Sequence, residues 1–185
     1  MEKVMYVNDK AYEVIRLLGK GKGGYSWLVT DGERKYTLKQ IHHEPCDFYH
    51  FGNKIEAEVR DYQRLKAIGI PMPELHDVDM EREHILKDYV QGEAIDRLIW
   101  ADKMEKSYFD QIKAMCGLLY PANTNIDYFP SNFIVRDGEL VYIDFECNDY
   151  MEDWDFEHWG VKYWSKTPEF LAYVENNQDR FQGVE

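Results

Sequence analysis

The sequence has no run of about eighteen apolar residues, so no stretch of it is expected to cross a membrane as a helix. Its first residues also lack the charged, then apolar, then small-residue pattern of a secretion signal. The three cysteines, Cys46, Cys116 and Cys147, are widely scattered and lack the spacing of metal ligands. These absences predict a soluble, cytoplasmic protein with free thiols and without a membrane partner.

Basic residues are also scarce: 22 Lys and Arg stand against 35 Asp and Glu, for a net charge of −13. Residues 1–60 carry 10 basic against 9 acidic residues, and the remainder carries 12 against 26. Nucleic acid is therefore excluded as an expected partner, because its binding depends on a basic surface that releases counterions. The densest acidic run, residues 144–157, is either a solvated face or a site for a metal or a cationic substrate.

What the sequence does contain is enough apolar material for a real core. The 185 residues are 44% hydrophobic and 15% aromatic, which is typical of a globular chain with one or two compact lobes.

The most informative stretch is residues 125–146. Asp127 is followed by Asn132, an apolar strand, an Asp137-Gly138 turn and a second apolar strand that ends in Asp144. Because Asp-Gly between alternating apolar runs is a strong hairpin signal, Asn132 and Asp144 are expected on adjacent strand ends, close enough to share one cation. A carboxylate that orients a hydroxyl and oxygen ligands for Mg²⁺ are the groups that phosphoryl transfer requires.

A glycine-rich segment follows the apolar run at residues 12–18. Three of its glycines have the spacing G-x-G-x-x-G: Gly19, Gly21 and Gly24. This pattern alone is weak, and a flexible turn accounts for it equally well. However, residues 25–30 are β-branched and aromatic and predict a strand, not the helix of a dinucleotide-binding fold, and Tyr25 stands where a Walker motif has lysine. A glycine hairpin that covers phosphates with its backbone remains.

Residues 35–41 alternate like a half-buried strand and include Lys39, while residues 53–66 have the apolar spacing of an amphipathic helix. A lysine on a strand is usually a solvated side chain, and a specific role requires a partner acid. The helix supplies Glu58, with Glu56 as the alternative. Such a pair would keep the lysine protonated and would fix the direction of its side chain.

The other predicted elements are two further strands, a linker and four helices. The strands, at residues 75–79 and 84–89, would close an antiparallel sheet, and a linker follows at 88–93. Residues 95–100 and 104–119 predict helices, and residues 156–164 have helical aromatic spacing. A last helix is expected from Thr167-Pro168-Glu169, which is a good helix start.

The glycine hairpin, strand lysine, helix glutamate and acid-to-asparagine loop occur in one fixed order. In this respect the sequence resembles the protein-kinase-like superfamily over about residues 12–160. Residues 127–132 (DYFPSN) match the D-x-x-x-x-N catalytic loop, and residues 143–146 (IDFE) match the metal-binding motif. The final glutamate, where protein kinases have glycine, looks more like the aminoglycoside phosphotransferase and choline kinase branch or small atypical kinases.

The resemblance implies an α+β, protein-kinase-like bilobal fold. Residues 1–90 would form an N-lobe made of an antiparallel sheet with one helix. Residues 91–185 would form a reduced, mainly helical C-lobe.

The resemblance also implies a role for each matched residue. In the N-lobe, Gly19, Gly21 and Gly24 would cover the phosphates of ATP, Lys39 would bind them and Glu58 would orient Lys39. Backbone groups at Asp88 and Val90 would pair with the adenine edge, although an ordinary loop fits these residues equally.

In the C-lobe, Asn132 and Asp144 would hold Mg²⁺, and Asp127 would accept the proton of the substrate hydroxyl or orient it. Asp155 would either brace the catalytic loop or cap a helix.

The sequence departs from the family pattern at three positions, and these departures leave two hypotheses for its function. Asn125 stands where the loop usually has histidine, Phe129 where Ser/Thr kinases have lysine, and Glu146 where they have glycine. The first hypothesis is an active minimal kinase that uses ATP and Mg²⁺ and acts on a protein Ser/Thr or a small-molecule hydroxyl. The alternative is a pseudokinase that acts as a nucleotide-responsive protein-binding module. The complete set of matched residues favours activity.

Overall fold

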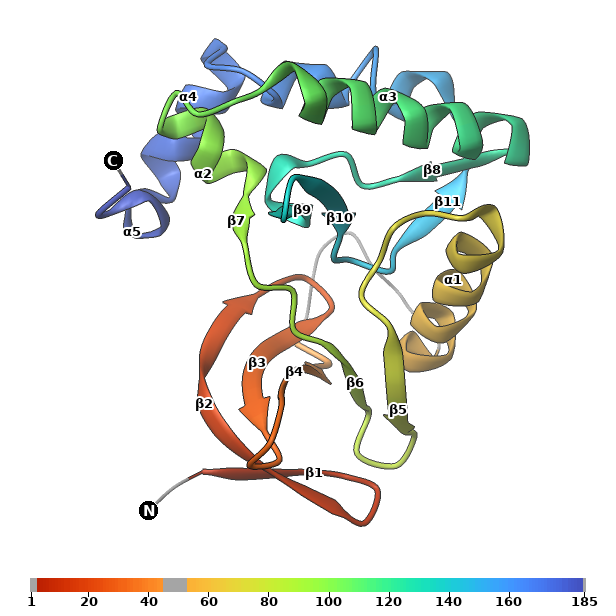
Figure 1. The fold of residues 1–185 in the computed structure, drawn as a ribbon. Coiled ribbons are helices and arrows are strands. Elements are labelled where there is room, and N and C mark those ends of the chain that lie inside the picture. Colours follow the sequence, from red (N-terminus) through yellow and green to blue (C-terminus); the bar gives the residue numbers. More distant parts are fainter. Residues whose placement is uncertain (1–2, 45–52, 185) are drawn as a thin grey trace. The chain divides into compact units, whose positions relative to one another are not determined.

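The computed structural model describes residues 3–44 and 53–184, in which the chain forms two compact units (Figure 1). Unit 1 comprises Met1–Arg60 and Pro73–Tyr89, and unit 2 comprises Asp61–Met72 and Val90–Glu185. The chain thus passes between the units after residues 60, 72 and 89. Of the three cysteines, Cys116 and Cys147 are buried free thiols, whereas Cys46 lies outside the described residues.

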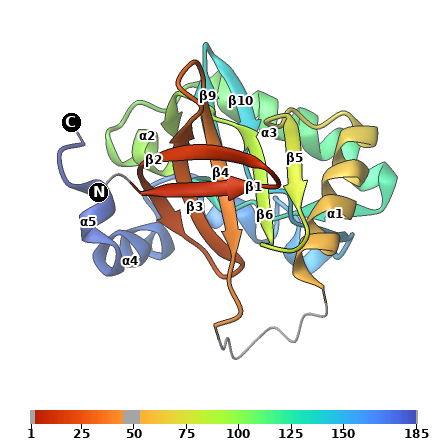
Figure 2. The ribbon, with the colours of Figure 1, turned by 90° about the horizontal axis from the view of Figure 1, so that it is seen from below.

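Unit 1 is built on a six-stranded antiparallel sheet in the order β1-β2-β3-β4-β6-β5, which Figure 2 shows from below. The strands are β1 (Val4–Val7), β2 (Lys10–Lys20), β3 (Gly24–Thr30), β4 (Lys35–Ile41), β5 (Leu75–Asp79) and β6 (His84–Asp88). Five of the six strands follow the sequence prediction, and β1 was missed. Val7, Tyr12, Val29, Leu38 and Leu86 form the core beneath the sheet.

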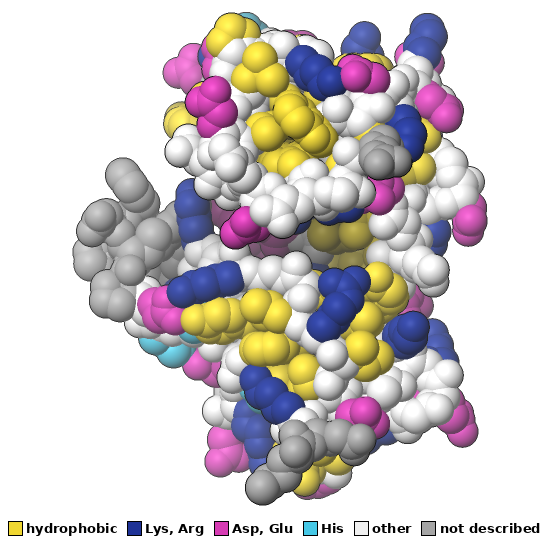
Figure 3. Space-filling model, turned by 90° about the vertical axis from the view of Figure 1, so that its left-hand side faces the viewer, with side chains coloured by type: hydrophobic (Ala, Val, Ile, Leu, Met, Phe, Trp, Pro, Cys, Tyr) yellow, Lys and Arg dark blue, Asp and Glu magenta, His cyan; other side chains and the backbone are white. Residues whose placement is uncertain are grey.

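Part of the apolar surface of unit 1 remains outside that core. Val4 and Tyr6 of β1 and Ile15 and Leu17 of β2 are exposed. On the face that Figure 3 shows, hydrophobic side chains of unit 1 lie between lysines and arginines. Long basic side chains cover some of this surface, since the Nζ of Lys3 lies 3.7 Å from the centre of the Trp27 ring.

The helix α1 (Lys54–Ile68) begins in unit 1 and ends in unit 2. The other helices belong to unit 2 and are α2 (Ile95–Trp100), α3 (Lys106–Leu119), α4 (Pro168–Asn176) and α5 (Gln178–Phe181). Two small antiparallel sheets accompany them, in the orders β10-β9-β7 and β11-β8. Their strands are β7 (Glu93–Ala94), β8 (Thr124–Ile126), β9 (Phe133–Arg136), β10 (Glu139–Tyr142) and β11 (Cys147–Asp149).

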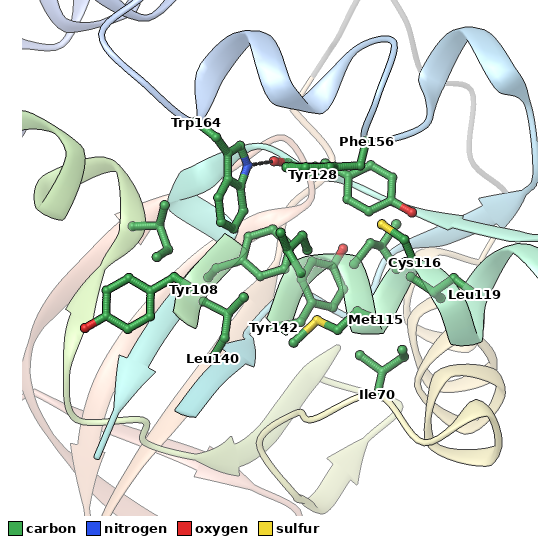
Figure 4. Packing of buried hydrophobic residues seen from close by; sticks show 14 of the residues in the cluster. Ile70, Tyr108, Met115, Cys116, Leu119, Tyr128, Leu140, Tyr142, Phe156 and Trp164 are labelled. Carbon is green, nitrogen blue, oxygen red and sulfur yellow. Dashed lines mark hydrogen bonds between the residues drawn. The ribbon is translucent and has the colours of Figure 1, made fainter. Parts of the chain in front are cut away.

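The core of unit 2 lies between α3 and the loops that carry the predicted site (Figure 4). Met115 and Leu119 of α3 contribute to it together with Tyr128, Tyr142 and Trp164, and all five are almost fully buried. None of the helices in the described parts of the chain is long and apolar enough to cross a membrane.

One predicted helix is wrong. Residues 156–164 form turns and the short 3₁₀ helix Gly160–Tyr163 instead of an α-helix. Within this segment the backbone closely approaches the catalytic-loop region at Gly160, where a Cβ would lie only 2.6 Å from the Cβ of Tyr128. The aromatic residues of this segment, whose spacing suggested a helix, are thus carried by an irregular backbone.

The helix start at Thr167 is confirmed and gives a stability prediction. The Thr167 hydroxyl accepts a hydrogen bond from the N–H of Phe170 at 3.2 Å and donates one to the carbonyl of Lys162. Because the Thr167→Ala variant would lose both bonds, it should unfold with a free energy lower by about 1 kcal/mol. Urea denaturation measures this change. The exposed Ser165 provides the control, since Ser165→Ala should change stability by less than about 0.5 kcal/mol; equal losses in the two variants would contradict the capping role.

Candidate functional site

The residues predicted for phosphate binding meet in unit 1. Lys39 lies on β4 and Glu58 on α1, and the Lys39 Nζ is 2.7 Å from Oε2 and 2.8 Å from Oε1 of Glu58. Both side chains are largely buried, with 14% and 10% of their surfaces exposed. The alternative partner, Glu56, is exposed. The ion pair therefore fixes the lysine ammonium between the strand and the helix.

The glycine hairpin joins β2 and β3 and is closed by a hydrogen bond from the Gly21 N–H to the Gly24 carbonyl at 2.9 Å. A Cβ on Gly24 would lie 2.4 Å from the carbonyl oxygen of Gln40, so this position admits only glycine without a backbone shift. Gly19 has open space around it. Gly23, which was not predicted, lies nearest to Lys39, because a Cβ there would be 3.7 Å from the Lys39 Nζ. The sequence alone gave no reason to single out Gly23 among the glycines of this segment.

The predicted adenine-binding residues fall at the boundary between the units in the sequence. Asp88 ends β6 in unit 1; its N–H donates to the carbonyl of Glu74 at 2.9 Å, and its carboxylate lies 2.6 Å from the His76 Nε2. Val90 begins the second segment of unit 2 and is buried. The Asp88 N–H is therefore used within unit 1, and an adenine contact at these residues stays a prediction.

The β9–β10 hairpin in unit 2 forms as the sequence predicts. Asp137 and Gly138 both have positive φ angles, of 53° and 82°, as a tight two-residue hairpin turn requires. At the open end of the hairpin, the N–H of Ile143 donates to the carbonyl of Asn132 at 2.9 Å. Asn132 therefore lies beside the residue that precedes Asp144.

The catalytic-loop residues are held by short-range hydrogen bonds. The Asp127 Oδ1 accepts from the N–H of Phe129 at 3.0 Å, and the Asn132 Nδ2 donates to the Asp127 carbonyl at 3.3 Å. The Asp144 Oδ1 accepts from the N–H of Phe145 at 2.8 Å. All three polar side chains are half-buried. This network sets their orientation before any ligand binds.

These side chains fit a magnesium ion by their chemistry. Since the Asn132 Nδ2 donates to Asp127, the amide oxygen is the atom left to face a cation, and Asp144 supplies a carboxylate. In the described part of the chain, no three His, Cys, Asp or Glu side chains gather as a metal site. A pair of oxygen ligands completed by phosphate and water is the usual arrangement for Mg²⁺ in phosphotransferases.

Tyr142, a site residue that the sequence prediction missed, links the two acidic motifs. Its hydroxyl accepts a hydrogen bond from the Asp127 N–H at 3.3 Å and donates one to the Glu146 carbonyl at 2.8 Å. Complete burial raises the pKa of Tyr142 far above its usual value, and the nearby charges of Asp144 and Asp127 add to the effect. The hydroxyl thus stays neutral and connects the predicted catalytic loop to the predicted metal-binding motif. In the sequence, Tyr142 is indistinguishable from an ordinary core residue.

Two further hydrogen bonds anchor the predicted catalytic loop to other parts of unit 2. The indole Nε1 of Trp164 donates to the Tyr128 carbonyl at 2.7 Å, as the dashed line in Figure 4 shows. Asn125, which replaces the family's histidine, is buried and donates from Nδ2 to the Met151 carbonyl at 2.9 Å. The loop is therefore anchored through residues that the resemblance did not assign.

Asp155 does not brace the catalytic loop. Its carboxylate accepts bonds from the His158 N–H at 2.8 Å and from the Tyr150 hydroxyl at 2.9 Å. Burial alone would raise the pKa of Asp155, but these hydrogen bonds outweigh it and leave the pKa below its usual value. Of the two predicted roles, the structure favours a local cap, here of the turn that contains residues 155–158.

Phe129, at the position of the family's lysine, packs among aromatic rings. Its ring centre lies 4.7 Å from that of Tyr173 and 5.0 Å from that of Tyr163. The loop therefore presents a backbone N–H to Asp127 at this position, but no side-chain cation.

No protein-family model matches the sequence. Two curated proteins are similar to it. The EKC/KEOPS complex subunit bud32 of Dictyostelium discoideum is 26% identical over 156 residues, which cover 79% of this chain and 61% of that protein. The KEOPS complex subunit Bud32 of Pyrococcus abyssi is 30% identical over 96 residues, which cover 50% of this chain and 44% of that protein.

The chain thus spans less than two thirds of either relative. These similarities support the resemblance to the protein-kinase-like superfamily. The fold is α+β and kinase-like, with an antiparallel sheet in the N-lobe and a reduced C-lobe. Neither relative is named as an aminoglycoside phosphotransferase or choline kinase, so that narrower assignment stays a prediction.

The position of Tyr142 gives a second prediction. Tyr142→Phe removes only the hydroxyl, which leaves the Asp127 N–H and the Glu146 carbonyl each without this partner. We expect the free energy of unfolding to fall by about 1 to 3 kcal/mol in chemical denaturation. The exposed Tyr6 gives the matched control, because Tyr6→Phe should change stability by less than about 0.5 kcal/mol. A Tyr142→Phe protein as stable as the control would show that the hydroxyl does not hold these segments.

Proposed function

We propose that this chain is a small atypical kinase that transfers the γ-phosphoryl group of ATP, with Mg²⁺, to a hydroxyl group of a protein Ser/Thr or of a small molecule. The observation that carries the proposal is the Lys39–Glu58 ion pair at 2.7 Å, placed beside the glycine hairpin. This combination supplies a fixed cation and nearby backbone amides, which are the groups that bind phosphates.

A purely structural salt bridge is the simpler alternative. Removing two charges from water is costly, however, and well-packed apolar residues often stabilise a fold as well as a buried pair does. The Lys39 ammonium also lies close to the backbone of the glycine hairpin, since a Cβ on Gly23 would be 3.7 Å from the Lys39 Nζ. A binding role therefore accounts for the placement of this pair better than stability does.

Unit 2 supplies the other groups that the reaction needs. Asp127 has a carboxylate oriented by the Phe129 N–H and would position the acceptor hydroxyl. Asn132 and Asp144 would hold Mg²⁺, which supplies charge neutralisation at the transferred phosphate. Since the carboxylate and amide orientations are already set by hydrogen bonds, little reorganisation is required when substrate binds.

A pseudokinase is the second candidate, and Phe129 favours it. Without a cation at this position, the loop gives less stabilisation to the charge that develops on the transferred group, so we expect slow turnover even in an active enzyme. Both relatives are named as KEOPS complex subunits. We therefore propose that this chain also assembles with protein partners, whichever of the two functions it performs.

Nucleotide binding gives the first functional prediction. ATP with Mg²⁺ at about one hundred times its Kd should stabilise the folded chain by about 2.7 kcal/mol, measured as a rise in melting temperature. Asp144→Ala should remove the part of the shift that requires Mg²⁺, because it removes a metal ligand. The exposed Asp110 on α3 provides a control, since Asp110→Ala should leave the shift unchanged. Absence of any shift in the unaltered protein at saturating nucleotide would argue against the kinase assignment.

Turnover gives the second functional prediction. ADP formation from ATP requires no identified acceptor and is a suitable readout. Asp127→Asn should lower its rate by about 10²-fold to 10⁴-fold, because the general base is lost, while the ATP-dependent rise in melting temperature persists. Undiminished ADP formation by Asp127→Asn would refute the role of this residue. Nucleotide binding without measurable turnover in the unaltered chain would instead identify a pseudokinase.

A further inference from the structure

A second surface of unit 2 has features that the proposed chemistry does not use. Trp154 is 55% exposed and Met151 is 57% exposed, and both belong to the segment around the short 3₁₀ helix Glu152–Trp154. Single exposed apolar residues are common, but two large ones within four residues, one of them a tryptophan, indicate a surface available for binding.

The Trp154 indole is the exposed end of a series of contacting aromatic rings. Its ring centre lies 5.8 Å from that of Trp159, which lies 5.3 Å from that of Tyr163. Tyr163 in turn contacts Phe129 of the catalytic loop at 5.0 Å. Because the inner rings are packed together, Trp159 holds the indole in place, and less side-chain entropy is lost when a partner binds.

The residues next to Trp154 are mainly acidic. Glu152 and Asp153 precede it directly and are exposed, and residues 144–157 contain no lysine or arginine. The nearest recorded cationic group to Glu152 is the Nε2 of His158, at 3.9 Å. Two exposed carboxylates beside an exposed indole form a surface that suits a cation, because the face of an aromatic ring and a carboxylate both attract positive charge.

We propose that Met151, Glu152, Asp153 and Trp154, here called the indole–acid surface, dock a basic segment of a partner protein. A lysine or arginine of the partner would lie over the Trp154 ring and pair with Glu152 or Asp153, and an apolar residue of the partner would cover Met151. The inference goes beyond the proposed function, since docking here requires neither ATP nor phosphoryl transfer.

Charge selects this occupant over the alternatives. Nucleic acid and anionic membranes would be repelled by the carboxylates. A second copy of the chain also carries a net charge of −13, which opposes self-association. A basic segment with apolar residues complements both the charge and the exposed aromatic surface.

The test uses a short fluorescein-labelled peptide of alternating arginine and leucine, with fluorescence anisotropy as the readout at low and at physiological salt. Trp154→Ala should weaken its binding about thirtyfold, as truncation of a binding hot spot does. Glu152→Lys combined with Asp153→Lys should weaken it at least as much at low salt. Glu13→Lys combined with Glu33→Lys, two exposed positions in unit 1, changes the net charge equally and should leave binding within about twofold.

Three outcomes would overturn the proposal. One is unchanged binding by a Trp154→Ala protein whose circular dichroism and melting temperature match those of the unaltered chain. Another is an equal loss in the Glu13/Glu33 control, which would indicate non-specific attraction to an acidic protein. The third is self-association that Trp154→Ala abolishes, without peptide binding, which would indicate a second copy as the occupant. Asp144→Ala should bind the peptide normally, so a failure of the proposed kinase function is distinguishable from a failure of docking.

Discussion

The cost of burying a polar group without a partner governs both parts of the candidate site. In unit 1, Lys39 and Glu58 are largely removed from water, and each is tolerable there because the other neutralises it. In unit 2, the hydroxyl of Tyr142 is fully buried and satisfies one backbone N–H and one backbone carbonyl from the two acidic motifs. The ion pair and the tyrosine hydroxyl each hold backbone segments in place. The residues proposed to bind ATP and Mg²⁺ lie on those segments. Preorganisation of the site thus follows from the same hydrogen bonds that make the fold stable.

The pattern of aromatic residues explains how the catalytic loop tolerates its departures from the family sequence. Phe129 lacks the positive charge of the lysine that Ser/Thr kinases have at this position. However, its ring packs on Tyr163 and Tyr173, and its N–H donates a hydrogen bond to the Asp127 carboxylate. Asn125 stands where the family usually has histidine, and its side chain anchors the loop by donating a hydrogen bond to the Met151 carbonyl. Both residues thus hold the loop that carries Asp127 through contacts of their own. In the proposed reaction, Phe129 would supply no positive charge near the transferred group, which bears on rate more than on binding.

Local chemistry explains which parts of the structure the sequence could predict. The Asp137-Gly138 hairpin, the cap at Thr167 and the alternating strand β4 depend on residues close together in the chain, and each formed as expected. Several of the missed features depend on distant partners. β8 and β11 are three residues each and exist because they pair with one another, and the 156–164 segment packs Gly160 closely against Tyr128. For the site, residue types and order indicated Lys39, Glu58 and the acid-to-asparagine loop, but Tyr142 and Gly23 gain their significance only from tertiary contacts.

The helix α1 also has a consequence for how the chain folds during synthesis. Its first half belongs to unit 1, while its second half belongs to unit 2, where Leu65 is completely buried in a core formed mostly by residues beyond position 90. The ribosome therefore releases every residue of unit 1 before Leu65 has its packing partners. Until the C-terminal half emerges, the apolar side of this helix is available to chaperones or to aggregation.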